Sequence, residues 1–588
     1  MGMQILRVSS ESPMTNNRHI TMADTVDAVK SIEEGLGAPN IIARILVSRG
    51  ITDIDEAESF LHPRLDDLSD PFLLPDMEKG VDRVIKAIVE KQKICIYGDY
   101  DADGITSTAL MINFFQHIGQ SPEVYLPKRQ EGYGLNIEAL SRLKSQSPEL
   151  LICLDCGSSN HDEIAFAKES GIETLVIDHH ELPDTMPEAY ALINPKRNDS
   201  RFPTRELAAC GVTFFFLWAL RRVMHRKGLL ENKINLKKEL DLVAIGTIGD
   251  MVPLTKDNRI LVKFGIENMR RQPRLWLKTF IKKNLLPRNG NIDEYALNFI
   301  IIPRINATGR VSKPEIALDF LICNDESKSE AMLLDLQKIN KERQDKEKSI
   351  LNEIEDIVTE NDFSDRNSIV LFKRDWHLGV IGIVAQKLVE KFGKPSIVIT
   401  EVNGIWKGSG RGGNGINLLE TISSLSHLLL KHGGHKYACG LSISEENLIP
   451  FSDAFEERVT VMPREIRKQY HVDTHAEFEE ITNEFMEFIE QLSPHGVGNP
   501  RPDLLLMTSD VSVINQRRVR IIDKNKKTWD GIIQNKNCFV SQPDISAIIG
   551  YPFIKKERDE RFINFYIKEF VLNEDALGSA VKGLLVSN

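Results

Sequence analysis

Long apolar runs are absent from the sequence. The longest run that could suggest a membrane segment, Phe214–Leu220, is far short of the roughly 20 apolar residues that a bilayer-spanning helix needs. Residues 1–14 also lack a cationic stretch followed by an apolar one, which is the pattern of a secretory signal. We therefore expect a soluble, cytoplasmic protein with no membrane partner.

Cysteine is scarce. The chain has 7 cysteines in 588 residues, odd in number and widely scattered, which excludes the disulfide framework of a small secreted protein. Cys153 and Cys156 form a C-x-x-C pattern that could indicate a zinc or redox site. No second pair follows, and Cys153 lies within the apolar run Leu151–Leu154, so buried thiols are the favoured interpretation.

The sequence also lacks an excess of positive charge. Lysine and arginine total 74 against 85 acidic residues, a net charge of −11, whereas proteins that coat duplex DNA are usually basic. Any contact with nucleic acid must therefore use local patches. The segments 270–283 and 516–529 place cations beside aromatic residues, which suits either single-stranded nucleic acid or an ordinary solvated surface.

An alternation of strand-like and helical segments dominates the region after residue 90. Short apolar runs at Ile94–Tyr97, Leu151–Leu154 and Thr174–Ile177 are separated by amphipathic stretches. This alternation predicts a parallel sheet with crossover helices, and hence an α/β fold.

The remaining segments extend this organisation. Residues 330–358 are highly charged, and their apolar seam breaks for about two turns, which favours a single bridging helix over a coiled coil. A second α/β unit follows, and short β-like runs beyond Pro500 suit a small barrel. The predicted domains are a helical lead-in (1–80), an α/β domain (81–260), connecting helices (261–360), a second α/β domain (361–460) and a C-terminal β domain (461–588).

Three polar clusters directly follow predicted strands. Asp99, Asp101 and Asp103 follow the first strand, Asp155 the second, and the triplet Asp178–His180 the third. Ligands in open parallel sheets bind beyond the carboxyl ends of the strands, so we expect these clusters to converge. Asp250, which ends a further apolar run, can join them.

Such a cluster indicates metal. Buried carboxylates repel one another unless cations neutralise them, and oxygen ligands with one or two imidazoles favour Mn²⁺ or Mg²⁺ over zinc or copper. This many carboxylates suits two ions bridged by an aspartate, as in enzymes that activate water at phosphorus. A lone D-x-D is more often a turn or cap, and paired histidines often only pack. Three clusters at matching positions favour the metal interpretation.

The runs IYGDYDADGITS, LDCGSS, IDHHE and GTIGDMVPL resemble the four motifs of DHH phosphoesterases. Within that superfamily the chain is most similar to the RecJ family of bacterial single-strand-specific 5′→3′ DNA exonucleases. The further runs PRINATGR (303–310), GSGRG (408–412), GGHKYACG (433–440) and PHGVGNPRP (494–502) add to this resemblance.

The resemblance implies a parallel-sheet DHH domain, a long connecting helix, a second α/β (DHH-associated) domain and a C-terminal OB-like β-barrel that binds nucleic acid. It also implies the residue roles. Two Mn²⁺ or Mg²⁺ ions are held by Asp99 and Asp101 on one side and by Asp103, His179 and Asp250 on the other, with Asp155 as the bridge. His180 faces the scissile phosphate, and Asp178 orients a histidine. The substrate-binding residues are Arg304, Asn306, Arg310, Ser409, Arg411, Gly434 and His435.

The implied activity is a metal-dependent exonuclease that degrades single-stranded DNA from a 5′ end to 5′-mononucleotides in repair and recombination. The implied partners are single-stranded DNA, a single-strand-binding protein and a helicase, and the protein is expected to be a monomer. The patch at 516–529 becomes the favoured DNA contact. One alternative is an oligonucleotide or cyclic-dinucleotide phosphodiesterase. Another is a metal-free replication scaffold, which is disfavoured because every motif aspartate and both histidines are present.

Two details of the second α/β domain remain. Gly412 and Cys439 stand where the family commonly has serine and alanine. The pattern Gly408-x-Gly410-x-x-Gly413 also satisfies the dinucleotide-binding fingerprint, but no helix is predicted to open at Gly413, and a dinucleotide site is disfavoured.

Overall fold

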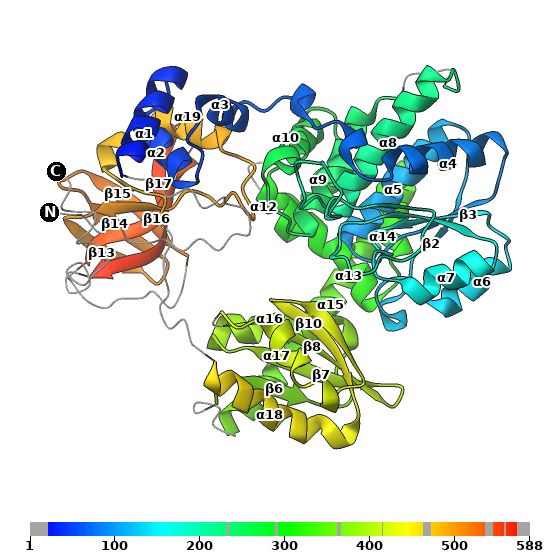
Figure 1. Cartoon of the computed structure of the whole chain (residues 1–588). Coiled ribbons are helices and arrows are strands. Elements are labelled where there is room, and N and C mark those ends of the chain that lie inside the picture. Colours follow the sequence, from blue (N-terminus) through cyan, green and yellow to red (C-terminus); the bar gives the residue numbers. More distant parts are fainter. Residues whose placement is uncertain are drawn as a thin grey trace. The chain divides into compact units, whose positions relative to one another are not determined.

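The computed structural model describes residues 22–230, 234–287, 292–360, 366–413, 415–462, 472–534, 545–557 and 560–572. The prediction about residues 1–14 and the predicted thiol of Cys538 fall outside these ranges. The chain divides into two compact units (Figure 1). One comprises the residues up to 68, 253–263 and those from 469 onward, and the other comprises 69–252 and 264–468.

A five-stranded parallel sheet organises the first part of the larger unit. Its order is β2-β1-β3-β4-β5, and each neighbouring pair is parallel. The strands are β1 (Ile94–Tyr97), β2 (Glu123–Tyr125), β3 (Leu150–Leu154), β4 (Glu173–Ile177) and β5 (Ala191–Ile193). Every residue of β1 and β3 is buried, as in strands with both faces covered. The three strands predicted from apolar runs are confirmed.

Helices cover this sheet. α5 (Ala102–His117) starts within the D-x-D segment, where Asp101 is the N-cap and accepts from the backbone N–H groups of residues 103 and 104. The apolar run before Asp250 forms α9 (Leu240–Gly249), with Asp250 as its C-cap. The other helices are α4 (Met77–Val89), α6 (Ile137–Lys144), α7 (His161–Glu169) and α8 (Ala209–Arg226).

Helices connect the two sheets of this unit. They are α10 (Lys256–Arg271), which begins in the smaller unit, α11 (Leu275–Lys282), α12 (Glu294–Ala296), η5 (Leu297–Ile301), α13 (Ile302–Val311), α14 (Glu315–Ile322) and α15 (Glu326–Glu360). α15 is one helix of 35 residues, which confirms the single bridging helix predicted over 330–358. Ile350 and Ile354 near its end are buried against α16 (Leu378–Phe392).

The second sheet of the unit has the order β6-β7-β8-β10-β9. Its strands are β6 (Ile369–Phe372), β7 (Ser396–Val402), β8 (Ile405–Arg411), β9 (Lys431–His435) and β10 (Ala438–Ile443), with α17 (Leu418–Ser423) and α18 (Leu448–Val461) as further helices. Only β6 and β7 pair in parallel. Gly408 and Gly410 lie within β8, and the next described helix begins at Leu418. The dinucleotide interpretation of this glycine pattern is therefore wrong.

The smaller unit pairs the two ends of the described chain. Its seven-stranded sheet has the order β11-β12-β16-β17-β15-β14-β13. The strands are β11 (Thr474–Ala476), β12 (Leu504–Met507), β13 (Asp510–Asn515), β14 (Arg518–Ile522), β15 (Thr528–Ile533), β16 (Ile545–Glu557) and β17 (Glu560–Leu572). α1 (Met22–Leu36), α2 (Asn40–Ser48), α3 (Ile54–Leu61) and α19 (Asn483–Gln491) complete the unit. Ile42 and Leu46 of α2 share one buried core with Phe485 and Phe565.

The predicted closed OB-like barrel is not observed. Among the described strands, no pairing joins the edge strands β11 and β13. The sheet has no need to close on itself to bury its apolar face, because α2 and α19 cover residues such as Phe565. The part of the fold class that concerns the two α/β domains is confirmed.

Candidate metal centre and phosphate site

The acidic clusters meet at the carboxyl edge of the parallel sheet. Asp99, Asp101 and Asp103 follow β1, Asp155 follows β3, and the triplet 178–180 follows β4. Asp250 arrives from the end of α9. The structure therefore brings together residues that are up to about 150 positions apart, as the strand-end argument predicts.

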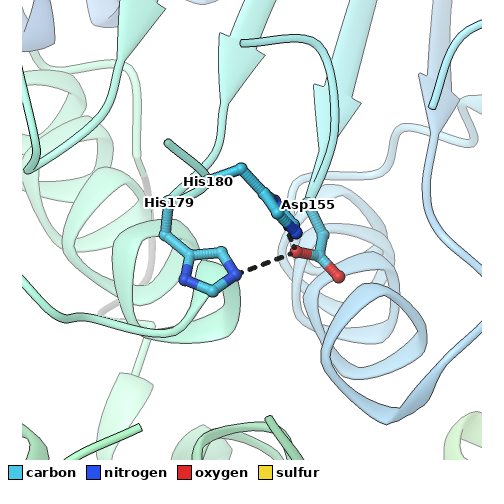
Figure 2. A group of neighbouring side chains, drawn as sticks. All are labelled: Asp155, His179 and His180. Atoms are coloured by element: carbon cyan, nitrogen blue, oxygen red, sulfur yellow. Dashed lines mark ion pairs between the residues drawn. The ribbon is translucent and has the colours of Figure 1, made fainter. Parts of the chain in front are cut away.

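Three groups of these side chains have potential ligand atoms within 4.8 Å of one another. The groups are Asp99, Asp101 and Asp155; Asp103, His179 and Asp250; and Asp155, His179 and His180. Figure 2 shows the last group, with both imidazoles turned toward the Asp155 carboxylate. The Nε2 atom of His179 lies 3.3 Å from Asp155 Oδ1, 3.5 Å from Asp250 Oδ2 and 3.8 Å from Asp103 Oδ2.

Several of the facing atoms have no hydrogen-bond partner. Within the described part of the chain, Asp99 Oδ1, Asp155 Oδ1 and His179 Nε2 are buried and unpaired. Leaving buried polar atoms unpaired costs free energy, and native structures rarely do so. Divalent cations in the ligand groups of Asp99 and of His179, both of which adjoin Asp155, would satisfy these atoms, so the residues fit a metal centre.

The electrostatics support the same conclusion. Burial and the neighbouring aspartates raise the pKa values of Asp99, Asp155 and Asp250 well above the usual range, and that of Asp103 to about 6. Burial, followed by the charge of His180, lowers the pKa of His179 to about 3. Without a cation, these carboxylates resist ionisation, whereas a bound cation would stabilise their charged form. The neutral imidazole of His179 can then act as a further ligand.

We expect the metal-free protein to become more stable as pH falls from 8 to about 6.5. Asp99, Asp155 and Asp250 have raised pKa values when folded, whereas unfolded aspartates titrate near 3.9. In this window the folded state binds protons that the unfolded state does not, so the free energy of unfolding rises as pH falls. Below pH 6.5, protonation of unfolded histidines opposes this because the pKa of His179 is lowered to about 3.

The measurement is the melting temperature in EDTA at each pH, with the Mn²⁺-loaded protein as the control. Bound cation should remove the trend, since it replaces the proton as the neutralising partner. If the melting temperature in EDTA stays constant or falls as pH is lowered from 8 to 6.5, the carboxylates do not repel one another as proposed.

Both carboxylate oxygens of Asp178 are hydrogen-bonded, in contrast to the unpaired Oδ1 atoms of Asp99 and Asp155. Its Oδ1 accepts from the backbone N–H groups of His179 (2.7 Å) and His180 (3.2 Å) and lies 2.8 Å from His180 Nδ1, and its Oδ2 accepts from Ser158 N–H at 3.0 Å. Although burial opposes ionisation, His180 and these bonds hold its pKa far below the usual range. Asp178 therefore positions His180 and has little capacity left for a cation.

Tyr133 is a site residue that the sequence reasoning missed. Its hydroxyl donates to the Asp155 carbonyl at 3.0 Å and lies 2.8 Å from His180 Nδ1, and its ring lies 5.0 Å from the His180 ring. It belongs to the glycine-flanked segment 129–134, between β2 and α6. The polar and aromatic residues of this loop could have indicated a site residue from the sequence, because loops often carry binding residues.

The two arginines expected to bind phosphate lie against the start of α16. Arg310, at the end of α13, donates to the Gly379 carbonyl at 3.3 Å. Arg411, at the end of β8, donates to Ser409 Oγ at 3.1 Å and to the carbonyl of residue 410 at 2.8 Å. A Cβ atom at Gly382 would lie 3.1 Å from Arg411 Nη2, so this glycine leaves room for the guanidinium.

Neither Arg310 nor Arg411 forms an ion pair with a described residue, and both donate to uncharged oxygens instead. Burial, with the nearby charges of Arg129, Arg343 and Arg411, lowers the pKa of Arg310 to about 9. Arg129, also missed from the sequence, lies over the Tyr100 ring at 4.7 Å. A cavity of about 450 Å³ beside Arg310 is lined by Lys128 and Lys346 as well as by Glu353 and Asp375. Guanidinium groups held together against their own repulsion favour a bound anion such as phosphate.

The remaining predicted substrate residues differ in placement. Asn306 Oδ1 accepts from Ala102 N–H at 2.8 Å, so this side chain holds the D-x-D loop. Arg304 turns back to the Ile300 carbonyl of its own helix. His435 is exposed at the end of β9, and partial desolvation, followed by the charges of Arg411 and His180, lowers its pKa.

Gly434 precedes His435 in β9 and has a φ of 142°. A Cβ atom there would lie 2.3 Å from the Ala438 carbonyl oxygen. Only glycine fits this position without strain, so Gly434 shapes the strand that carries His435.

The basic patches are less available than the sequence suggests. In the first, Arg274 pairs with Glu239 at 2.6 Å, and Lys283 pairs with Glu330 at 2.7 Å. Trp276 and Trp529 are only 1% and 8% exposed. Neither tryptophan is available to stack on bases, because both rings fill protein cores.

The cysteine prediction is confirmed within the described residues. Cys153 and Cys156 are buried free thiols, and burial raises their pKa values well above the usual range. No described helix is long and apolar enough to cross a membrane.

Comparison with known proteins identifies the family. Residues 93–247 match the DHH family, N-terminal domain, and residues 365–460 match the DHHA1 domain. The chain is 36% identical to the single-stranded-DNA-specific exonuclease RecJ of Bacillus subtilis over 85% of its own length and 64% of that protein. It is 33% identical to RecJ of Haemophilus influenzae over 90% of its own length and 93% of that protein.

Solved structures agree with this assignment. RecJ from Thermus thermophilus in complex with Mn²⁺ superimposes with a TM-score of 0.79 at 24% identity, covering 93% of this chain and 78% of that one. A manganese-bound exonuclease RecJ gives a TM-score of 0.57 at 29% identity, covering 67% of this chain and 97% of that one. The chain therefore belongs to the RecJ family of single-stranded-DNA-specific exonucleases.

Proposed function

We propose that this protein is a metal-dependent exonuclease that hydrolyses single-stranded DNA from the 5′ end and releases 5′-mononucleotides. The observation that carries the proposal is the placement of a cation-binding cluster beside a cluster of unpaired guanidiniums in one unit. Carboxylates alone would repel a phosphodiester. The arginines supply the binding, and the cation centre supplies the chemistry.

The grouping of the side chains supports the proposed ligand roles. Asp155 takes part in two of the three ligand groups and is our candidate for the bridge between two Mn²⁺ or Mg²⁺ ions. Asp99 and Asp101 would complete one ion's protein ligands, and Asp103, His179 and Asp250 the other's. When bound, the ions activate water and neutralise charge at phosphorus.

The chain's own residues orient the substrate. Arg310 and Arg411 would grip phosphate oxygens through paired N–H donors. His180, fixed by Asp178 at 2.8 Å, has a pKa that its carboxylate partner raises to about 9 against the effect of burial. Held in this orientation, its imidazole would face the scissile phosphate.

The two clusters support stepwise removal of nucleotides from a phosphorylated end, and the proposed 5′→3′ direction rests on the resemblance to the RecJ family. A terminal phosphate carries one more negative charge than an internal diester and would be favoured where several arginines meet. With the terminal phosphate held there, the next phosphodiester along the strand would lie at the metal centre. Each cycle would release one nucleotide.

The smaller unit is our candidate for an additional single-strand contact. Arg517, Arg518 and Arg520 lie on or beside β14 and are exposed, so the sheet can attract a phosphate backbone without the barrel closure of an OB fold. Single-strand-binding protein and a helicase are the partners that the family suggests, in a cytoplasmic repair setting.

Degradation of end-labelled single strands in Mn²⁺ tests the proposal. Wild-type protein should release a labelled mononucleotide from a 5′-labelled strand from the earliest times, while a 3′-labelled strand should shorten gradually. A matched duplex should resist. Gradual shortening of the 5′-labelled strand would reverse the direction. Hydrolysis of dinucleotides alone would instead indicate a small-substrate phosphodiesterase.

A further inference from the structure

Tyr295 and Phe299 form an exposed aromatic pair. Their side chains are 55% and 66% exposed, and their ring centroids lie 4.8 Å apart at an interplanar angle of 36°. Tyr295 belongs to α12 and Phe299 to η5, a π-helical turn, and such turns are frequent at functional sites. Large apolar side chains gathered on a surface often mark a binding site.

The surroundings of the pair favour a polyanion that carries apolar groups. Arg270 donates to the Ile292 carbonyl at 2.7 Å, is exposed, and forms no ion pair with any described residue. Of the acids near these residues in sequence, Asp293 accepts from a backbone N–H at 3.0 Å, Glu294 is 5% exposed, and Glu267 is paired with Arg271. An exposed cation bonded to the backbone three residues before Tyr295, together with two exposed rings, is a combination that suits single-stranded nucleic acid.

The pair is also continuous with the active site. α12, η5 and α13 follow one another without a break from Glu294 to Val311, and Arg310 lies at the far end. Next to this rod, the metal-ligand candidate Asp250 follows Gly249, whose added Cβ atom would lie 3.5 Å from Ile302. The aromatic pair and the phosphate-binding arginine thus occupy one helical support.

The length of that support sets a distance in nucleotides. Phe299 and Arg310 are 11 residues apart, or about 16 Å at ~1.5 Å per residue. That corresponds to about five stacked nucleotides at ~3.4 Å each, and to fewer in a stretched strand.

We infer that Tyr295 and Phe299 are a stacking platform for bases of the single strand, several nucleotides from the 5′ phosphate. The inference rests on the proposed exonuclease function and adds a determinant of substrate length to it. The two buried tryptophans cannot serve this purpose, whereas these two rings are accessible. Base–aromatic stacking tolerates any sequence, which suits a non-specific nuclease.

The test compares the Y295A/F299A double variant with wild type on a 5′-phosphorylated trinucleotide and a 20-mer. The long strand should bind about tenfold more weakly or worse by fluorescence anisotropy in EDTA, given the usual effect of removing a stacking ring. kcat/KM for the trinucleotide should stay within about twofold, since it is too short to reach the rings. The conservative Y295F/F299Y variant should restore tight binding.

The matched control is Ile449→Ala, which removes an equally exposed apolar side chain (65%) on α18. It should change neither substrate. A 2-aminopurine base moved stepwise from the 5′ end should report stacking at one internal position in wild type, and that signal should be lost in the double variant.

Two outcomes would overturn the platform. Equal losses on trinucleotide and 20-mer would show that the rings act on the catalytic centre or the fold. No loss on either would leave the pair to another occupant, such as a protein partner. Wild-type protein that neither binds nor degrades the 20-mer would instead defeat the proposed function.

Discussion

Replacing Asp155 by asparagine is expected to abolish hydrolysis while making the metal-free protein more stable. The carboxylate is 2% exposed, its Oδ1 is unpaired, and burial with four neighbouring aspartates raises its pKa well above the usual range. Removing the charge relieves that repulsion in the absence of metal. It also removes the side chain shared by two ligand groups.

Asparagine is the matched substitution for a backbone reason. Asp155 has a φ of 62°, in the left-handed region that asparagine and aspartate tolerate better than other non-glycine residues. Alanine would add backbone strain to the loss of the ligand and confuse the two effects. Asparagine preserves the shape and isolates the charge.

Turnover should fall by more than about 100-fold, since loss of a partner that only supports a ligand already costs 10- to 100-fold. Wild-type protein should gain melting temperature on addition of Mn²⁺, and the variant should gain much less. In EDTA at pH 8, where no metal is bound, the variant should have a higher melting temperature than the wild-type protein. Retained turnover, or a variant that melts lower in EDTA, would refute Asp155 as a shared ligand.

Replacing Arg310 by glutamine is expected to remove the preference for a 5′-phosphate. Wild-type protein should degrade a 5′-phosphorylated strand faster than its 5′-hydroxyl counterpart. Loss of one charged donor should reduce kcat/KM on the phosphorylated strand by about 10- to 100-fold, the usual scale for charge-assisted hydrogen bonds. The 5′-hydroxyl strand should be affected far less, so the ratio of the two rates should approach one.

Arg343 supplies the matched control. It contributes charge near Arg310 but is already paired with Glu347 and Asn340 at 2.8 and 2.7 Å. Arg343→Gln should reduce stability and leave the phosphate preference intact. If both variants reduce the 5′-phosphate preference equally, the cluster acts through its overall positive charge, and Arg310 makes no specific contact with the phosphate.

The metal site could be predicted because its signals are local. Each aspartate cluster directly follows an apolar run, as Asp155 follows Leu150–Leu154, and parallel strands bring such positions to one edge. Tyr133 and Arg129 could not be found this way. They lie on an irregular segment whose path depends on tertiary contacts, such as the Tyr133 hydroxyl with the Asp155 carbonyl.

The orientation of the tryptophans and the open C-terminal sheet could not be predicted, for another reason. Composition places Trp529 beside lysines, but it cannot show that the indole turns inward and donates to Asp523 at 2.9 Å. Nor can a run of short strands show what covers them. The predicted barrel closure over residues 461–588 assumed that the sheet must bury its own apolar face. In the structure that face is covered by Ile42 and Leu46 of α2, which lie more than 400 residues earlier in the chain.

That shared core has a consequence during biosynthesis. The apolar faces of α2 and α3 emerge from the ribosome long before their partners in β12 to β17, which are the last described strands to be made. At the usual 5–20 residues per second, the helices wait from about half a minute to nearly two minutes for that surface. The larger unit can fold meanwhile. Chains that terminate early, or variants lacking the final strands, would leave these helices without a partner and should be captured by chaperones or aggregate.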